Sequence, residues 1–324
     1  MNSKLKYREL CRNDHRIPLF SKDWWLDTVC GDDKWDVSIV EKDNRIISSL
    51  PYYIKSKSGF TLLEMPPLTQ SLGPWINFPT NQKPAKRFQF EKKMLNALIE
   101  ELPKYDYFHQ NFHYSLQNWL PFYWSNFKQS TRYTYILDDL TDTDKLWKNL
   151  QSNIRSDIKK AESRFNLRVE SSDDIDLFYK INSQSFQKQN ISIPYTKQFI
   201  LNLDNACKKN SCRLILFAKD SDDQVYSTVY IVWDENSAYY LMGGNNPSLP
   251  NSGANSLLLW HAIKHVSTFT NKFNFEGSMI EPIERFFRAF GANQQPYFSI
   301  SRNQSKLLFT LLTLKESLNM LRGH

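Results

Sequence analysis

The chain has 324 residues, which is enough for about two domains of ordinary size. With 41% hydrophobic and 23% charged residues it is not a disordered protein, and with only 9 glycines it is neither collagen-like nor a glycine-rich repeat. The net charge of +7 favours an anionic partner such as a nucleotide, an RNA or an anionic membrane surface, although a lysine-rich solvated surface gives the same balance.

Cysteine content and apolar runs indicate the compartment. The four cysteines are too few and too scattered for a disulfide framework, and no set of cysteines and histidines has the spacing of a zinc site. The N-terminal residues lack the apolar core and cleavage site of a signal peptide, and the apolar run 307–314 is too short to cross a bilayer. We therefore expect a cytoplasmic protein with no metal and no integral membrane association.

The first half begins with a helix that Ser21 caps and Gly31 ends. Two strands follow and form a hairpin, because the Lys-Asp-Asn between them suits a tight turn. Residues 65–75 hold three prolines and a glycine, which predicts a long irregular loop of the kind that often lines sites. The remaining predicted elements of this half are the hairpin strands 35–40 and 45–54, a helix at 88–101, and strands at 105–114 and 131–138.

Aromatic residues are concentrated between positions 105 and 135, where twelve occur. They could form a platform on which nucleic acid bases stack, but a sheet face packed against a helix explains them equally and is the interpretation we favour. His109 and His113 lie in the same segment. On a strand their spacing places them too far apart to share a metal ion, so we expect structural histidines.

A domain boundary is predicted at the acidic, threonine-rich residues 138–144, after which Thr143 caps one long helix over residues 144–165. This helix and the residues after it carry seven lysines and arginines against two acids within residues 145–168. Arg155 and Lys159 share one face of it. Such a run is usually a solvated surface, but at a substrate opening it would hold a phosphate or a carboxylate.

The second half repeats the element order of the first, which indicates a duplicated α+β domain. A polar loop at 243–254 separates its third strand from an amphipathic helix. The predicted elements are helices at 173–187 and 194–210, strands at 212–219, 225–234 and 238–242, a helix at 255–268, a strand at 273–276, a helix at 281–290, a strand at 297–301 and a closing helix at 305–321.

The strand, loop and helix between residues 241 and 262 hold the most informative pattern. Gly243 and Gly244 leave backbone N–H groups uncovered, and the start of the following helix concentrates partial positive charge. Together they predict a site for a phosphate or pyrophosphate. The alternative is a tight loop in which Asn and Ser side chains only cap the helix, and spacing does not decide between the two.

Several segments of the second half resemble, in order, the acyltransferase domain shared by Fem-type (FemAB-like) peptidyltransferases and BioF2-like acyltransferases of the GNAT superfamily. The resemblance covers about residues 147–302. The segments are Trp147-x-x-Leu150-x-x-x-x-Arg155-x-x-Ile158-x-Lys160-Ala161, Leu214-Ile-Leu-Phe-Ala-Lys-Asp, Val225-Tyr-Ser-Thr-Val-Tyr, Tyr239-Tyr-Leu-Met-Gly-Gly-Asn-Asn-Pro, Gly253-Ala-Asn-Ser-Leu-Leu-Leu-Trp260, Phe273-Asn-Phe-Glu-Gly-Ser278 and Ile283-x-x-Phe286-Phe-x-x-Phe290-Gly291.

The resemblance implies an α+β fold of two tandem GNAT-like domains, each a mixed, mostly antiparallel sheet flanked by helices. It places the N-terminal domain at 1–140 and the C-terminal acyltransferase domain at 141–324. The implied activity is transfer of an acyl or aminoacyl group to an amine or hydroxyl of a cell-wall or polysaccharide precursor. The donor would be an acyl-CoA, such as acetyl-CoA, or an aminoacyl-tRNA, and the acceptor a small or nucleotide-linked molecule.

Such a transfer needs oriented substrates, a stabilised oxyanion and one proton acceptor. Glu276, at a strand end, is the candidate base, or else it caps the following turn. Tyr195 and Tyr240 are candidate proton donors to the leaving group, or else packing residues. The candidate donor-binding residues are Gly243, Gly244, Asn245, Asn251, Ser252, Gly253, Ala254 and Asn255, and the candidate substrate-binding residues are Arg155, Lys159 and Ser278.

Two other classes of function are consistent with the same residues. One is a non-catalytic GNAT-like scaffold that binds a nucleotide-sugar or a protein partner. The other is a nucleic acid binder, which the basic charge would support. The leucine-rich C-terminal helix could contact a membrane, but its leucines cover more than one stripe and favour docking on the second domain.

Overall fold

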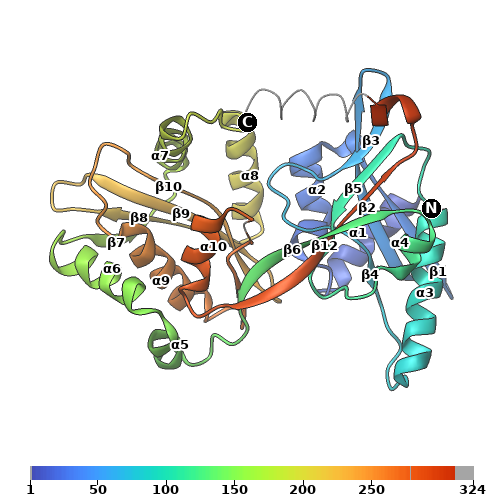
Figure 1. The fold of residues 1–324 in the computed structure, drawn as a ribbon, viewed down its shortest axis with the longest axis horizontal. Coiled ribbons are helices and arrows are strands. Elements are labelled where there is room, and N and C mark those ends of the chain that lie inside the picture. Colours follow the sequence, from blue (N-terminus) through green and yellow to red (C-terminus); the bar gives the residue numbers. More distant parts are fainter. Residues whose placement is uncertain (1, 278, 311–324) are drawn as a thin grey trace. The chain divides into compact units, whose positions relative to one another are not determined.

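A computed structural model describes residues 2–277 and 279–310 and forms two compact units (Figure 1). The first unit comprises the residues up to 132 together with those from 296 onward, and the second comprises residues 133–295. Each unit is a sheet with helices packed on it. The α+β class expected from the sequence is therefore confirmed.

The first unit is built on a five-stranded path in the order β1-β2-β3-β5-β12, and β4 pairs with β2 beside it. Helix α1, strand β3 and helix α4 were not predicted from the sequence. The elements are α1 (Ser3–Asn13), the 3-10 turns Leu19–Ser21 and Asp32–Lys34, α2 (Asp23–Cys30), β1 (Trp35–Lys42), β2 (Arg45–Lys57), β3 (Phe60–Glu64), β4 (Trp75–Ile76), α3 (Pro84–Glu100), β5 (Tyr107–Asn111), α4 (Leu120–Trp124) and part of β12 (Asn293–Asn303).

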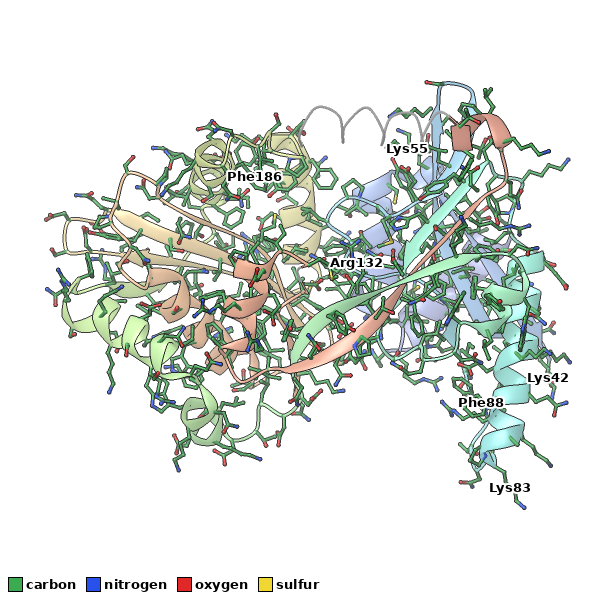
Figure 2. All side chains as sticks on the ribbon, viewed as in Figure 1. Lys42, Lys55, Lys83, Phe88, Arg132 and Phe186 are labelled. Carbon is green, nitrogen blue, oxygen red and sulfur yellow. The ribbon has the colours of Figure 1, made fainter. Side chains whose placement is uncertain are left out.

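The predicted hairpin and loop of this unit are confirmed. Asp43 and Asn44 both have positive φ, 51° and 60°, which is the backbone of a two-residue hairpin turn between β1 and β2. No regular helix or strand occurs from residue 65 to residue 74. The one backbone bridge in this stretch joins Leu72 to Phe112. Helix α3 starts four residues before the predicted Phe88, because Pro84 suits a first helical turn (Figure 2).

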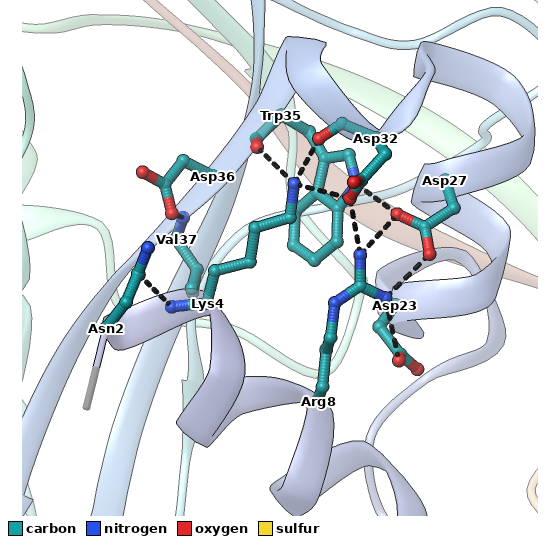
Figure 3. A network of polar contacts seen from close by, with 9 residues as sticks. All are labelled: Asn2, Lys4, Arg8, Asp23, Asp27, Asp32, Trp35, Asp36 and Val37. Atoms are coloured by element: carbon teal, nitrogen blue, oxygen red, sulfur yellow. Dashed lines mark hydrogen bonds and ion pairs between the residues drawn. The ribbon is translucent and has the colours of Figure 1, made fainter.

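A charged network fixes the N-terminal helix to its neighbours (Figure 3). The guanidinium of Arg8 on α1 pairs with both carboxylate oxygens of Asp27 on α2, at 2.6 and 2.7 Å, and also reaches Asp23 and Asp32. Lys4 lies over the ring of Trp35 at 4.2 Å. These contacts compensate the acidic side chains of α2, so this cluster is structural.

The aromatic residues between 105 and 135 mostly form a core, as the favoured interpretation predicted. Phe108, Phe112, Phe122 and Phe127 are buried in one cluster with residues of α3 and of the sheet. His109 bonds Ser299 through Nε2 at 3.0 Å and His113 bonds Ser115. Within the part of the chain described, no group of His, Cys, Asp and Glu side chains has the arrangement of a metal site.

The second unit is a sheet in the order β6-β11-β10-β9-β8-β7. From α7 to α10 its strands and helices follow the predicted order, with β10 three residues longer and β11 two residues shorter than predicted, whereas strand β7 was not predicted. The elements are β6 (Lys128–Leu137), α5 (Thr143–Asn149), α6 (Ser152–Ser163), β7 (Arg168–Ser171), α7 (Ile175–Lys188), α8 (Lys197–Lys209), β8 (Arg213–Lys219), β9 (Val225–Trp233), β10 (Ala238–Asn245), α9 (Ala254–Val266), β11 (Phe273–Asn274) and α10 (Glu281–Arg288).

Helices cover both faces of this sheet (Figure 1). On one face, Val229 and Ile231 of β9 belong to a core shared with α6 and α9. On the other face, Tyr230 contacts Phe178 of α7 edge-on, with ring centroids 5.5 Å apart. A central strand buried on both faces explains why the sequence of β9 is apolar almost throughout rather than alternating.

The prediction of a single helix over residues 144–165 is wrong. The segment forms two helices, α5 and α6, and the N-cap is Asp142 rather than Thr143. The chain is extended at Leu150 and Gln151, and the N–H of Gln151 donates to the carbonyl of Ala289. A tertiary hydrogen bond therefore interrupts a pattern that is locally helical.

The two units have the same strand topology, which supports the predicted duplication. In each, an antiparallel meander of three strands is followed by a helix and then by a strand parallel to the third. Strand β3 pairs in parallel with β5 through Leu62 and Leu63, and β10 pairs in parallel with β11 through Ala238 and Tyr239. The helices that cross over are α3 and α9.

The repeats exchange their last strands. Strand β6, which follows the first repeat in the chain, pairs antiparallel with β11 of the second unit, through Leu137 and Ile136. Strand β12, which follows the second repeat, pairs antiparallel with β5 of the first unit over residues 299–303. The expected boundary was 140/141, with the second domain running to residue 324. The compact units instead divide at 132/133 and 295/296 because of this exchange.

The predicted closing helix at 305–321 lies largely outside the described residues. Its described part, residues 305–310, belongs to the first unit. Across the described ranges, none of the helices is long and apolar enough to cross a membrane. The four cysteines are free and buried.

Candidate functional site

Strands β10 and β11 separate in the middle of the second unit. They pair only at Ala238 with Phe273 and at Tyr239 with Asn274. Strand β10 then continues to Asn245, paired with β9 alone. Among the described residues, the edge of β10 that turns away from β9 is thereby left without a strand partner beyond Tyr239, although side chains of α7 bond the carbonyl of Gly243 and the N–H of Asn245.

Gly243 and Gly244 are part of strand β10, not of the predicted loop. They pair with Val229 and Thr228 of β9, so the expectation that both leave their backbone uncovered does not hold. Gly244 is required by packing, because a Cβ there would approach the backbone of Asn182 on α7 to 2.7 Å. These glycines bring a helix close to the strand.

A cavity of about 470 Å³ lies where β10 ends and α9 begins. Its walls come from the end of α7, from residues 245–256 and from α10, and most of its polar groups are neutral amides and hydroxyls. Lys188 is the one basic residue among those that line it, and Asp157 the one acid. The predicted donor-binding residues that line it are Asn245, Asn251, Ser252, Gly253, Ala254 and Asn255, whereas Gly243 and Gly244 do not.

The first turn of α9 forms part of the wall of this cavity. Gly253 caps the helix in the left-handed region with φ of 83°, a backbone conformation that favours glycine. Asn251 and Ser252 accept the N–H groups of Gly253 and Ala254, both at 3.3 Å. Capping of this kind was the alternative to a phosphate site, and the same loop also lines the cavity. The side-chain oxygen Oδ1 of Asn255 is buried without a hydrogen-bond partner.

Two of the three candidate catalytic residues share a polar cluster. The hydroxyl of Tyr195 donates to Oδ1 of Asn182 at 2.8 Å, and Nδ2 of Asn182 donates to the carbonyl of Gly243 at 2.7 Å. Burial raises the pKa of Tyr240 to about 12, while the neighbouring amide of Asn255 opposes that shift. Burial also raises the pKa of Tyr195, and Tyr240 adds to that shift. Both tyrosines therefore keep their protons near neutral pH and can donate them.

Glu276 follows β11 in an unusual conformation. Its φ of 59° is in the left-handed region, held by a hydrogen bond from its own N–H to Oδ1 of Asn274 at 2.8 Å. Its carboxyl oxygen Oε1 is buried without a hydrogen-bond partner, and burial raises the pKa of the carboxyl well above its usual range. A non-glycine residue in this region carries strain of about 1 kcal/mol or more, which is common at functional positions.

Not all the candidates come together. Glu276, Tyr195 and Tyr240 are not among the residues that line the cavity, and no hydrogen bond between described residues links Glu276 to either tyrosine. Asn255 connects the cavity with the tyrosine cluster, since it lines the cavity and lies beside Tyr240.

The predicted substrate-binding cations lie elsewhere. Arg155 donates to the carbonyls of Lys148 and Leu150 and so closes the break between α5 and α6. The side chain of Lys159 is exposed and does not line the cavity. The predicted Ser278 lies outside the described residues.

Sequence reasoning missed the contribution of α7. Asn182, Ser185 and Gln189 lie three and four positions apart, on one face of this helix. Asn182 holds Gly243, Oγ of Ser185 accepts the N–H of Asn245 at 2.7 Å, and Gln189 lines the cavity. This polar stripe on a helix with an otherwise apolar buried face was the signal that could have identified them.

Comparison with known proteins identifies a family domain. Residues 148–270 match the family described as acetyltransferase (GNAT) domain. This match lies within the second unit and contains the separated part of β10 and all the residues that line the cavity except Phe286. No curated protein matches the sequence.

Three solved structures have the same fold over most of this chain. FemX has a TM-score of 0.68 at 12% identity, with 94% of this chain and 98% of FemX covered. The C-terminal domain of a putative lysylphosphatidylglycerol synthetase from Agrobacterium fabrum has a TM-score of 0.57 at 12% identity, with 96% of each chain covered. L-PGS from Bacillus licheniformis has a TM-score of 0.50 at 10% identity, with 83% of this chain and 85% of L-PGS covered. The expected Fem-like tandem GNAT fold is confirmed.

Proposed function

We propose that this GNAT-type acyltransferase moves an acyl or aminoacyl group from an activated donor to an amine or hydroxyl of a cell-wall or polysaccharide precursor. One observation carries the proposal. Strand β10 has an open edge that leads to a 470 Å³ cavity at the first turn of α9. A strand edge without a strand partner, beside a helix N-terminus, suits an acyl carbonyl and an attached phosphate.

The donor is proposed to be an acyl-CoA, with aminoacyl-tRNA as the alternative. We propose that the cavity binds the phosphate-bearing end of the donor. It would do so through N–H groups and amides more than through charge, because Lys188 is the one basic residue in its lining. One feature speaks against acyl-CoA, since Asn251-Ser-Gly-Ala-Asn255 stands where the family's CoA-binding loop would carry Gln/Arg-x-x-Gly-x-Gly. The aminoacyl-tRNA alternative is supported by the similarity to FemX and by the net charge of +7.

In the proposed reaction, one bond to the acyl carbon forms and one breaks. The amine or hydroxyl of the acceptor adds to the acyl carbonyl, and the bond from that carbon to the sulfur or oxygen of the donor breaks. Glu276 is proposed to take the proton of the attacking group, because burial raises its pKa and strengthens it as a base. Tyr240 or Tyr195 is proposed to return a proton to the leaving group. N–H groups on the open edge of β10 would stabilise the oxyanion.

The test combines binding with turnover. Acetyl-CoA, longer acyl-CoAs, aminoacyl-tRNA, UDP-sugars and UDP-linked peptides are screened for a rise in melting temperature, because a ligand of the native state must stabilise it. Any donor that binds is then radiolabelled in its acyl group and incubated with the protein and with the UDP-sugars and UDP-linked peptides as acceptors. Labelled acceptor supports the proposal. Binding of a UDP-sugar with no transfer from any donor would instead favour the non-catalytic scaffold.

A further inference from the structure

The first unit carries an exposed apolar surface that the proposed reaction does not use. We define the aromatic face as four side chains on α3 and α4 that are about half exposed: Phe88 (60%), Leu120 (48%), Tyr123 (57%) and Trp124 (53%). Apolar side chains of this size are normally buried, and a contiguous group of them at a surface marks a binding surface.

Helix α4 gives this face its direction. Leu120, Tyr123 and Trp124 are three and four residues apart, so they lie on one side of the helix. Pro121 and Phe122 are buried on its opposite side, and Phe122 belongs to the core of the unit. The packing of Phe122 therefore obliges the other three side chains to face outward.

Helix α3 extends the face and adds charge to it. Nζ of Lys92 lies 4.5 Å from the ring of Trp124, and Phe88 is one turn before Lys92 on the same side of α3. The first turns of α3 are exposed on all sides, from Pro84 to Gln89. Figure 2 shows Lys83 and Phe88 on the end of this helix, which projects beyond the sheet of the unit.

Residues 83–93 hold five basic side chains and one acid. The acid, Glu91, is buried and accepts a hydrogen bond from Asn118 at 3.0 Å, so it does not neutralise the surface. Among the described residues none of the five bases forms an ion pair, and Arg87 lies instead over the ring of Phe78 at 3.5 Å. The five are Lys83, Lys86, Arg87, Lys92 and Lys93.

We infer that the aromatic face, together with Lys92 beside it, forms a docking surface for an anionic lipid bilayer, and that the other four bases around the exposed end of α3 add long-range attraction. Trp and Tyr are the residues that favour the interface between headgroups and acyl chains, and nearby lysines and arginines are attracted to anionic headgroups. An RNA would use the aromatic rings for stacking and the bases for phosphates. It would gain nothing from Leu120, and the convex, helical shape gives no groove to follow a strand. The lipid surface accounts for both features.

The test is sedimentation of the full chain with vesicles of two compositions. Vesicles of 30% phosphatidylglycerol in phosphatidylcholine should bind the protein, whereas pure phosphatidylcholine vesicles should bind it at least tenfold less. Raising the salt from 0.1 to 0.5 M should weaken the binding, because the attraction to the headgroups is screened. Equal binding to both compositions would overturn the inference, as would no binding to either.

Variants assign the binding to this surface. Replacing Phe88→Ala together with Trp124→Ala should reduce the partition coefficient about tenfold or more. Lys92→Gln, on the same side of α3 as Phe88, should reduce it about fivefold, and Lys86→Gln, on the opposite side, should reduce it by less. The matched controls in the second unit are Ile191→Ala, which is 53% exposed, and Lys209→Gln, and both should bind as the unaltered protein does. All these side chains are exposed, so an unchanged melting temperature verifies that the variants fold.

Two results would contradict the assignment. One is unchanged vesicle binding in the Phe88 and Trp124 double variant. The other is loss of binding to a mixed-sequence RNA oligonucleotide in these variants with no vesicle binding in the parent protein, which would assign the face to RNA. Because the measurement needs no substrate, it is independent of whether the proposed acyl transfer is found.

Discussion

The hydroxyl of Tyr240 lies directly against the Cα of Gly243, three residues further along the same strand. A methyl group on Gly243 would collide with that hydroxyl. Strand β10 has a register irregularity between Tyr240 and Met242, which is what allows a side chain to fold along its own strand in this way. The glycine therefore sets the position of a proposed proton donor.

Gly243→Ala should impair activity more than stability. The collision is mainly with the far end of the Tyr240 side chain, while the backbone carbonyl of Thr228 lies 3.0 Å from the added methyl group, so we expect a loss of about 1 kcal/mol in unfolding free energy. The rate of acyl transfer should fall about as far as it does in Tyr240→Phe. If both variants are slow, the double variant should be no slower than Tyr240→Phe, because the two changes act through one group. If the rate losses of the two single variants multiplied in the double variant, the two changes would act through different groups and the prediction would be wrong.

Gly244→Ala, one residue away, should have the opposite signature. Its methyl group would meet the backbone of Asn182 and the carbonyl of Ile181, at 2.7 and 2.9 Å, and backbone cannot yield cheaply. We expect a loss of about 2 kcal/mol in urea unfolding as α7 is displaced from β10. A Gly244→Ala protein as stable as Gly243→Ala would show that α7 is not packed as described.

Asn182→Ala should destabilise the second unit more than Tyr195→Phe. Asn182 is 1% exposed and makes two hydrogen bonds, to Gly243 and from Tyr195. The alanine leaves a buried carbonyl and a hydroxyl unpaired, at a cost of about 2 to 4 kcal/mol, whereas the phenylalanine removes one neutral bond at about 1 kcal/mol. Urea unfolding of both variants measures the difference. Equal losses would mean that Asn182 does not support Gly243.

Glu276→Gln should remove the acid limb of the pH–rate profile. Because burial raises the pKa of Glu276, the base form and hence the rate should rise with pH through a pKa above the usual value of about 4.3. The amide cannot accept the proton, so the variant should be slower by about 10² or more and lack this limb. An unchanged rate would exclude Glu276 as the base.

The same substitution should change how stability depends on pH. A carboxyl whose pKa is raised on folding binds more protons folded than unfolded, so the stability of the unaltered protein should fall as pH rises from about 4.3 toward the raised value. The amide of the variant is neutral at every pH in this range. The melting temperature of Glu276→Gln relative to the parent should therefore increase with pH over this range and be constant below it. A difference independent of pH would show that the carboxyl is solvated.

The strand and helix pattern of the second unit could be predicted because its segments are periodic and bounded by Gly, Pro or Asn. The α5–α6 break could not, since it depends on Gln151 donating to Ala289, a residue far away in sequence. Helix α1 was missed because only Tyr7 and Cys11 of its residues are buried, and its position depends on the ion pairs of Arg8.

The site was predicted in part for similar reasons. The loop from Asn251 to Asn255 was found because Gly and Asn before an apolar helix are a local signal. Arg155 was predicted from its charge, which is visible in sequence, whereas the backbone carbonyls that it bonds, those of Lys148 and Leu150, are not. Gly243 and Gly244 were found as important positions, but their reason is contact with Tyr240 and Asn182 rather than an uncovered backbone.

The exchanged strands also constrain the order of events during synthesis. The first unit cannot complete its sheet when β5 leaves the ribosome, because the strand that pairs with β5 comes from residues 299–303. At about 5–20 residues per second, the edge of β5 waits roughly 10–40 s for its partner. Until then the first unit has an unpaired strand edge, which is a site of aggregation. A nascent chain of this protein is therefore most dependent on chaperones between the emergence of β5 and that of β12.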